Sequence, residues 1–287
     1  MRKVKITGMN GYLGSVISRK LVAKGYMVSG IQRELLYGST QQLSNELKGS
    51  DIIINLAGAS ILQRWTKKNK EIIYESRVKT TSNLVQAINL LNEKDRPKKF
   101  ISASAIGIYQ SGKLHDENST IFENGFVGKV AKEWEDSLIK LPDSIQKNIF
   151  RIGLVLGKNA KTIKNLLLPF KLGIGGTIGN GKQAFPYIHE LDLVNAFVWV
   201  IEKFEKSDTF NLVAPECISN KVFTKSLSKN LNRPAFFPVP GFALRIFYGE
   251  AASLLLESPA VEPKRLLEEG FRFKFPTIEA TLSEIIS

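Results

Sequence analysis

Short apolar runs alternate with apolar positions at helical spacing along the first half of the chain. Val4 and Ile6 indicate a strand, helical spacing follows as far as Gly25, and residues 27–31 indicate a second strand. The chain therefore begins with a βαβ unit. The same alternation predicts helices over 40–48, 66–92 and 128–141, and strands over 51–57, 100–104 and 149–156.

The strand predicted over 51–57 is apolar at almost every position, which indicates burial on both faces and favours a parallel sheet. Glycines crowd the segment 173–181, after which a helix over 190–204 and a strand over 209–213 return to the earlier pattern. Proline-punctuated segments and a helix over 242–256 follow. This change of pattern indicates a second, smaller lobe.

The chain has 287 residues, enough for one nucleotide-binding domain with a smaller companion. We therefore predict an α/β fold, a Rossmann-like doubly wound parallel sheet with a small α+β C-terminal substrate lobe. The NADP-binding Rossmann domain is expected over 1–160 and 186–214, and the substrate-binding lobe over 161–185 and 215–287.

Composition excludes several classes of protein. The hydrophobic (43%) and charged (23%) fractions are those of a globular domain, and the chain has no run of about 18 apolar residues that could span a membrane. Residues 1–7 lack the apolar stretch of a secretory signal, so we expect a cytoplasmic protein without membrane attachment. One cysteine and two histidines exclude an internal disulfide and give no basis for a metal site.

The net charge of +13 would suit an anionic ligand or a nucleic acid. Basic residues are spread along the chain, and the densest group, 67–70, is followed at once by Glu71 and Glu75. That pattern favours a solvated helix start over a nucleic-acid surface. We expect a small-molecule substrate and no nucleic-acid partner, and the sequence leaves open whether the chain forms an oligomer.

The sharpest chemical signal is a glycine-rich turn, residues 8–14, between the first strand and the first helix. Gly8 permits the tight turn, Gly11 lets the backbone approach a pyrophosphate, and Gly14 allows close packing of helix on strand, while the helix N-terminus attracts the anion. A glycine-rich turn without a ligand is the alternative. The predicted dinucleotide contacts are Gly8, Asn10, Gly11, Tyr12, Leu13 and Gly14.

Arg33 follows the second predicted strand, where an NAD-binding protein would usually place an acidic residue on the ribose. Its guanidinium suits the 2′-phosphate of NADP, and a surface pair with Glu34 is the alternative. The residues Leu56, Ala57 and Gly58 end the next strand and would let the cofactor lie against the backbone, unless they form an ordinary turn. We therefore predict NADP as the cofactor.

Two further patterns resemble chemical sites. Residues 176–183 nearly spell a P-loop, but Gln183 replaces the magnesium-binding hydroxyl and Pro186 disfavours the helix that should follow. His189 and Asp192 could form a base and its orienting partner, but a lone histidine more often satisfies hydrogen bonds within the fold. Neither pattern receives a catalytic assignment.

The chain resembles the extended short-chain dehydrogenase/reductase superfamily, the NAD(P)-dependent nucleotide-sugar epimerases and dehydratases. The motifs that carry the resemblance follow in family order: the turn 8–14, Asn-Leu-Ala-Gly at 55–58, Ser-Ala-Ser-Ala-Ile-Gly-Ile-Tyr at 102–109, Arg-Ile-Gly at 151–153 and Tyr-Ile-His-Glu-Leu-Asp at 187–192. Trp134-Glu135, Leu168–Gly173, the loop 179–183, Pro263–Leu267 and Gly270–Phe273 resemble an uncharacterised epimerase-family branch with its own C-terminal domain. The resemblance adds Ser102 and Arg151 to the cofactor-binding set.

The resemblance also implies a catalytic tyrosine, a lysine four residues later and an upstream serine or threonine. In this sequence Phe126 stands where the tyrosine belongs and Val130 where the lysine belongs. Lys129 could reach the ribose instead, although an exposed lysine is the alternative. Ser104 lies within one residue of the serine position, and Tyr109 could supply a phenol, although its place is more typical of packing or substrate contact.

Two functions remain open. The first is an NADP-dependent oxidoreductase or epimerase-like enzyme that transfers hydride to or from an unknown carbonyl or carbinol substrate, with Ser104, Tyr109 and Lys129 as its catalytic residues. The second is a non-catalytic NADP(H)-binding sensor or partner-binding module that lacks the Tyr-Lys pair. Cofactor binding is common to both.

Overall fold

Six parallel strands form one sheet of order β2-β1-β3-β4-β6-β9 in the computed structural model. The structure describes residues 1–287, leaving out the side chains of residues 161, 162 and 165. The chain leaves β1 for β2 on one side and returns to β3 on the other side. In a doubly wound fold, a reversal of this kind opens a crevice at the carboxyl ends of the strands, where ligands bind.

The strands of the large sheet are β1 (Lys3–Thr7), β2 (Met27–Ile31), β3 (Ile52–Asn55), β4 (Lys99–Ala105), β6 (Gln146–Ile152) and β9 (Asp208–Leu212). Two short parallel pairs join β5 (Leu114–His115) to β10 (Ala260–Val261) and β7 (Leu154–Leu156) to β8 (Tyr187–His189). The helices are α1 (Tyr12–Ala23), α2 (Arg33–Tyr37), α3 (Thr40–Leu47), α4 (Lys67–Tyr74), α5 (Thr80–Asn89), α6 (Phe126–Asp136), α7 (Lys161–Lys171), α8 (Glu190–Lys203), α9 (Asn220–Leu231), α10 (Gly241–Tyr248), α11 (Ser253–Leu256), α12 (Lys264–Glu268) and α13 (Ile278–Ile286).

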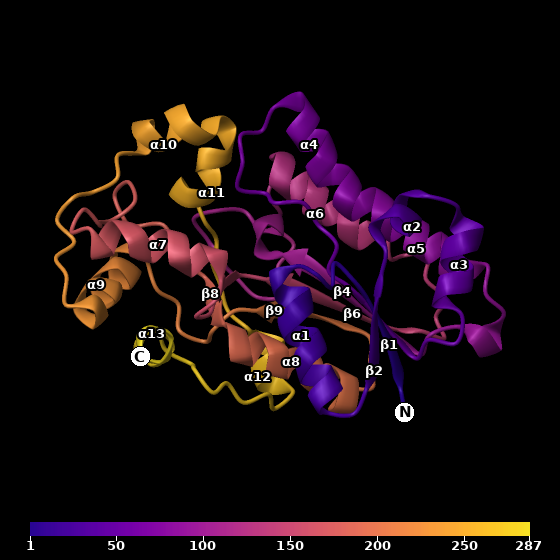
Figure 1. Cartoon of the computed structure of the whole chain (residues 1–287). Coiled ribbons are helices and arrows are strands. Elements are labelled where there is room, and N and C mark those ends of the chain that lie inside the picture. Colours follow the sequence, from indigo (N-terminus) through magenta and orange to yellow (C-terminus); the bar gives the residue numbers. More distant parts are fainter.

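Helices cover both faces of the large sheet (Figure 1). On β3, Ile52 and Ile54 belong to the hydrophobic core beneath α1 and α8, while Ile53 belongs to the core beneath α3 and α5. All three side chains are buried, as expected for a strand whose alternate residues face opposite covered sides. The predicted Rossmann-like parallel sheet is confirmed.

A third core lies in the part of the molecule that α7, α9 and α13 build. Helices α10 and α11 lie beside it, next to the loop that precedes α4 (Figure 1). Lys70 of α4 and Glu250 form an ion pair at 2.5 Å, and Arg64 lies beside Gly249. We call α7, α9, α10, α11, α13 and their connections the C-terminal lobe. Within the described part of the chain, no helix combines the length and the apolar character needed to cross a membrane.

Three predicted elements differ from the structure. The helix predicted over 66–92 is α4 and α5 joined by a π-helical turn, Glu75–Lys79. The strand predicted over 149–156 is divided at Gly153, where a Cβ would lie 2.8 Å from the carbonyl oxygen of Pro186. The helix predicted over 242–256 is interrupted at Gly249, whose φ of 59° is a conformation that glycine adopts without strain.

Candidate cofactor-binding site

The turn between β1 and α1 is closed too tightly for side chains. A Cβ at Gly14 would lie 2.3 Å from the carbonyl oxygen of Gly8, and Gly8 itself has a φ of 68°. The Gly11 amide donates to the Gly8 carbonyl at 2.9 Å, which closes the bend. The backbone therefore requires glycine at positions 8 and 14, as the sequence predicts.

The N-terminus of α1 has free amides. Gly11 is the N-cap and offers no side chain to accept from the first turn, which also lacks an acidic residue. The first backbone N–H groups of a helix have no partner within the helix, so those of Tyr12, Leu13 and Gly14 can receive an anion. Asn10 lies in the exposed bend just before them. The arrangement suits a diphosphate.

Thr7 ties this turn to the end of β3. Its hydroxyl donates to Asn55 Oδ1 at 2.8 Å and accepts from the amides of Leu56 and Ala57 at 2.9 and 3.0 Å. A Cβ at Gly8 would lie 3.0 Å from the Leu56 carbonyl oxygen, so the two backbones almost touch. The glycine turn and residues 56–58 thus form one rigid edge at the reversal point of the sheet.

Arg33 occupies the first position of α2, immediately after β2. Its side chain is exposed, and the guanidinium carbon lies 5.8 Å from the centre of the Tyr37 ring. Among the ion pairs between described residues, none joins Arg33 to Glu34. The guanidinium is therefore available to a ligand at the end of β2.

Ser102, which the resemblance places against the cofactor, lies inside the sheet. Its side chain is fully buried, and the hydroxyl accepts from Asn55 Nδ2 at 3.3 Å. Asn55 also donates to Thr81 at 2.8 Å, and Trp134 donates to the same threonine oxygen at 2.9 Å. Ser102 therefore supports the crevice edge from below through Asn55.

Arg151 lies within the protein, where it links two of the candidate catalytic residues, Tyr109 directly and Ser104 through Glu135. It donates to Glu135 from Nε at 2.9 Å and from Nη2 at 2.7 Å, and from Nη1 to the Tyr109 hydroxyl at 2.7 Å. Ser104 donates to the same carboxylate at 2.6 Å. The sequence predicts a catalytic role for Ser104 and Tyr109 and a cofactor contact for Arg151, but it assigns no role to Glu135, which joins Ser104 to Arg151.

Tyr109 is 1% exposed, and its hydroxyl donates to Asn211 Oδ1 at 2.9 Å while accepting from Arg151. Burial raises the pKa of this phenol above its ordinary value, although Arg151 and Asn211 act in the opposite direction. The ring also stacks on His115 at 4.8 Å. This environment suits the packing role that the sequence left open for Tyr109 beside a catalytic one.

Helix α6 presents the positions of the family's tyrosine and lysine. Phe126 packs edge-on against Trp65, with ring centres 5.2 Å apart, and Val130 is 4% exposed. Lys129 is exposed, and no hydrogen bond or ion pair joins it to another described side chain. The pair that supplies proton transfer in the family is thus replaced by apolar packing.

Arg77 was missed by the sequence reasoning. It lies in the π-helical turn and donates from Nη2 to the Ala59 carbonyl at 2.9 Å and from Nη1 to the Ile73 carbonyl at 3.1 Å. Burial lowers the pKa of its guanidinium to about 10, and no described carboxylate pairs with it. An arginine on the buried stripe, four residues after Ile73, was the signal that could have found it.

His189 and Asp192 have structural roles. His189 caps α8 by accepting from the Leu191 amide at 3.1 Å, and its other ring nitrogen lies 3.0 Å from Glu284 of α13. Asp192 accepts from the amides of Lys274 and Phe275 at 2.7 and 2.8 Å. Both side chains therefore fasten the C-terminal segment to the sheet domain.

Comparison with known proteins gives two matches to family models. Residues 4–213 match the NAD dependent epimerase/dehydratase family, and residues 239–285 match a domain of unknown function (DUF1731). The first match covers well over half of the chain. The boundary between the two matches falls inside the C-terminal lobe.

Individual relatives match over nearly the whole chain. The epimerase family protein SDR39U1 of Mus musculus is 34% identical over 295 residues, covering 99% of this chain and all of the relative. The epimerase family protein YfhF of Bacillus subtilis is 30% identical, covering 99% of this chain and 98% of the relative. The crystal structure of human epimerase family protein SDR39U1 with NADPH superposes with a TM-score of 0.91, at 32% identity and 99% coverage of both chains.

Proposed function

Because the chain belongs to the NAD dependent epimerase/dehydratase family, we propose that it binds NADP(H) across the carboxyl ends of β1, β2 and β3. The observation that carries the proposal is the uncapped N-terminus of α1 behind the closed turn 8–14. The NADPH in the human relative's structure supports the same cofactor here.

The residues present fit the cofactor in charge and in space. The amides of residues 12–14 would hold the diphosphate, with Asn10 and Gly11 at its side. Arg33 would bind the ribose 2′-phosphate, which favours NADP(H) over NAD(H). Leu56, Ala57 and Gly58 would lie along the ribose and the bases, since their backbone is fixed by Thr7.

Arg77 adds a charge beneath this edge. Its guanidinium lies half-buried beside Gly58, and the contacts described above give it neutral partners only. A partly desolvated cation without a counter-ion is unfavourable, and an anionic ligand group nearby relieves that cost. We propose that Arg77 favours the bound, anionic cofactor through the 57–59 backbone.

The bound nicotinamide would exchange a hydride with a carbon atom of a carbonyl or carbinol substrate. Ser104 is 4% exposed and donates its hydroxyl hydrogen to Glu135, which leaves its oxygen as an acceptor for a substrate hydroxyl that reaches the carboxyl end of β4. Lys129 stands in the first turn of α6, from which it would approach the cofactor ribose. The lobe over 161–185 and 215–287 would frame the substrate.

A second candidate function is a cofactor sensor without turnover. Phe126 and Val130 replace the family's proton-transfer pair, and Tyr109 is buried in a hydrogen-bond network. These three observations favour binding without proton transfer. The two functions share the cofactor site and differ only in whether a substrate is reduced or oxidised.

The decisive experiment follows NADPH absorbance in the presence of a panel of aldehydes, ketones and sugar nucleotides. Enzyme function predicts turnover with at least one carbonyl substrate and a lower kcat in Ser104→Ala, at unchanged NADPH affinity. Tight NADPH binding without turnover across the panel contradicts enzyme function and supports the sensor. Phe126→Tyr is a further variant, which places a tyrosine at the family's position. The Phe126 ring is only half-buried and can accept a hydroxyl, whereas a lysine in place of Val130 would enter the core.

A further inference from the structure

We propose that the C-terminal lobe docks on an anionic membrane surface through an exposed apolar face surrounded by basic residues. This inference is independent of the cofactor site and of any reaction performed there. It concerns attachment to the surface of a membrane.

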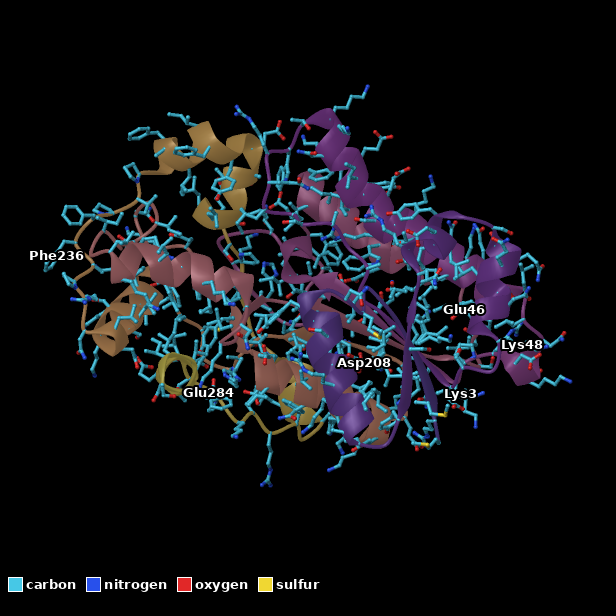
Figure 2. The ribbon with its side chains drawn as sticks, viewed as in Figure 1. Lys3, Glu46, Lys48, Asp208, Phe236 and Glu284 are labelled. Atoms are coloured by element: carbon cyan, nitrogen blue, oxygen red, sulfur yellow. The ribbon has the colours of Figure 1, made fainter. Side chains whose placement is uncertain are left out.

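The apolar face consists of large hydrophobic side chains that a folded protein normally covers. Figure 2 shows one of them, Phe236, at the outer margin of the lobe. Its exposed fraction is 80%, and none of the residues of α10 is buried. The members and their exposed fractions are Leu168 59%, Leu172 65%, Ile174 58%, Phe236 80%, Phe237 60%, Phe242 69%, Ile246 65% and Phe247 74%.

The segments that contribute to this face are joined to one another. The Val239 amide donates to the Thr177 carbonyl at 2.8 Å, and the Gly179 amide donates to the Val239 carbonyl at 2.9 Å. A Cβ at Gly176 would lie 2.0 Å from the carbonyl oxygen of Phe237. The loop that follows α7 therefore lies directly against the segment that leads into α10, which places both groups of apolar side chains in one region.

The charge of this region is mainly positive, and Glu257 is an acidic residue beside Phe242 and Arg245. Residues 158–185 and 217–249 contain ten lysines and arginines and no aspartate or glutamate, so they supply ten of the thirteen net positive charges. Lys164 and Lys171 lie on α7 beside the apolar leucines, and Arg245 lies on α10 next to Ile246; all three are exposed. Glu250, the first acidic residue after α10, is paired with Lys70.

The exposed apolar side chains and the positive charge together favour a lipid surface over a second copy of the chain. A symmetric contact with a second copy would bring the same basic residues against each other, which is unfavourable. A lipid surface with anionic headgroups attracts the lysines and arginines, while the phenylalanines enter the boundary between headgroups and acyl chains. Short helices with one apolar face and basic neighbours are typical of such interfacial binding.

The test is co-sedimentation of the full chain with vesicles. We expect binding to vesicles of phosphatidylglycerol and phosphatidylcholine that is at least about tenfold tighter than binding to phosphatidylcholine alone, and that weakens as salt is raised. Phe242→Ser with Phe247→Ser should reduce binding about tenfold or more. Lys171→Glu with Arg245→Glu should reduce it as well, because attraction to the headgroups is lost.

Ile139→Ser is the matched control, because Ile139 is also 71% exposed but lies after α6, outside the lobe. It should leave vesicle binding unchanged. Thermal unfolding establishes that each variant is folded, which is expected because the altered side chains are exposed. Absence of binding to anionic vesicles at low salt would overturn the proposal. So would equal binding to neutral vesicles, or self-association that the two serine substitutions abolish.

Discussion

The guanidinium of Arg77 lies against the backbone of Gly58: a Cβ at position 58 would be 3.2 Å from Arg77 Cζ. The π-helical turn that carries Arg77 brings the charge to this place, and a turn of this kind is frequent at functional sites. The half-buried guanidinium and the crevice edge are thus separated only by the 57–59 backbone.

Arg77→Met should weaken NADPH binding about tenfold, which corresponds to about 1.4 kcal/mol of lost electrostatic interaction. Arg77→Lys should weaken it less, because the charge remains although the forked hydrogen bonds are lost. Calorimetric titration of both variants measures the effect. Unchanged affinity in Arg77→Met, together with a lower unfolding temperature of the free protein, would assign Arg77 to structure alone.

Arg33→Asp should reverse the preference for NADPH over NADH. The substitution removes the exposed guanidinium that would pair with the 2′-phosphate and places a carboxylate where ribose hydroxyls can bind. We expect NADPH affinity to fall about tenfold or more, with NADH affinity equal or higher. Arg19→Asp is the control, since Arg19 is exposed on α1 and has the same charge change. Identical selectivity in both variants would remove Arg33 from the site.

Tyr109→Phe should reduce stability and leave NADPH binding unchanged. The substitution leaves Arg151 Nη1 and Asn211 Oδ1 without their phenol partner in a site that is 1% exposed, at a cost of about 1–3 kcal/mol. Denaturant unfolding measures this change. Tyr74→Phe is the control, because the Tyr74 hydroxyl contacts Glu133 at the surface and should matter little. A large loss of turnover with full stability would instead identify Tyr109 as catalytic.

Acid should loosen the C-terminal helix through His189. Burial lowers the pKa of this imidazole below its ordinary value of 6.5, although Glu284 acts in the opposite direction. At pH values between the folded and unfolded pKa of His189, the unfolded chain binds more protons than the folded one. The contribution of His189 to the free energy of unfolding is therefore complete above pH 6.5 and declines as the pH falls. The slope is at most about 1.4 kcal/mol per pH unit.

Unfolding free energies at several pH values check this, with His189→Asn as the comparison. Asparagine can still cap α8 but does not titrate, so its profile should lack the decline that begins at pH 6.5. Protonation of His189 would also displace the Leu191 amide from Nδ1. Parallel profiles for the two proteins would show that His189 does not contribute.

The sequence was sufficient for the sheet domain because its signals are local. The strand around Ile53 is apolar on both faces. The spacing of the glycines at 8, 11 and 14 is enough to indicate a turn whose backbone requires glycine. The ends of elements were less predictable, because two glycines interrupt continuous apolar patterns. Gly153 does so through its close approach to the Pro186 backbone and Gly249 through its positive φ, and neither is visible in the sequence.

The candidate site was predictable only in part. Glu135 acts through Arg151 and Ser104, and Arg77 acts through the Ala59 carbonyl, so both roles depend on contacts between separate elements of the fold. Neither residue stands in a motif that indicates a charge inside the protein. Tyr109 shows the opposite problem: a correct family motif indicates a phenol, but burial against Arg151 depends on strands β4 and β6 being adjacent. The exposed apolar face was not predicted, because residue types alone do not indicate which apolar side chains are exposed.

Isothermal titration calorimetry of the purified chain with NADPH tests the central claim most directly. The account predicts saturable binding at one site per chain, weakened at least about tenfold in Gly14→Ala, whose Cβ would lie 2.3 Å from the Gly8 carbonyl oxygen. Gly241→Ala, whose Cβ would meet only the Leu256 side chain at 3.3 Å, should bind like the unaltered protein. No binding to the unaltered protein at millimolar NADPH would contradict the account.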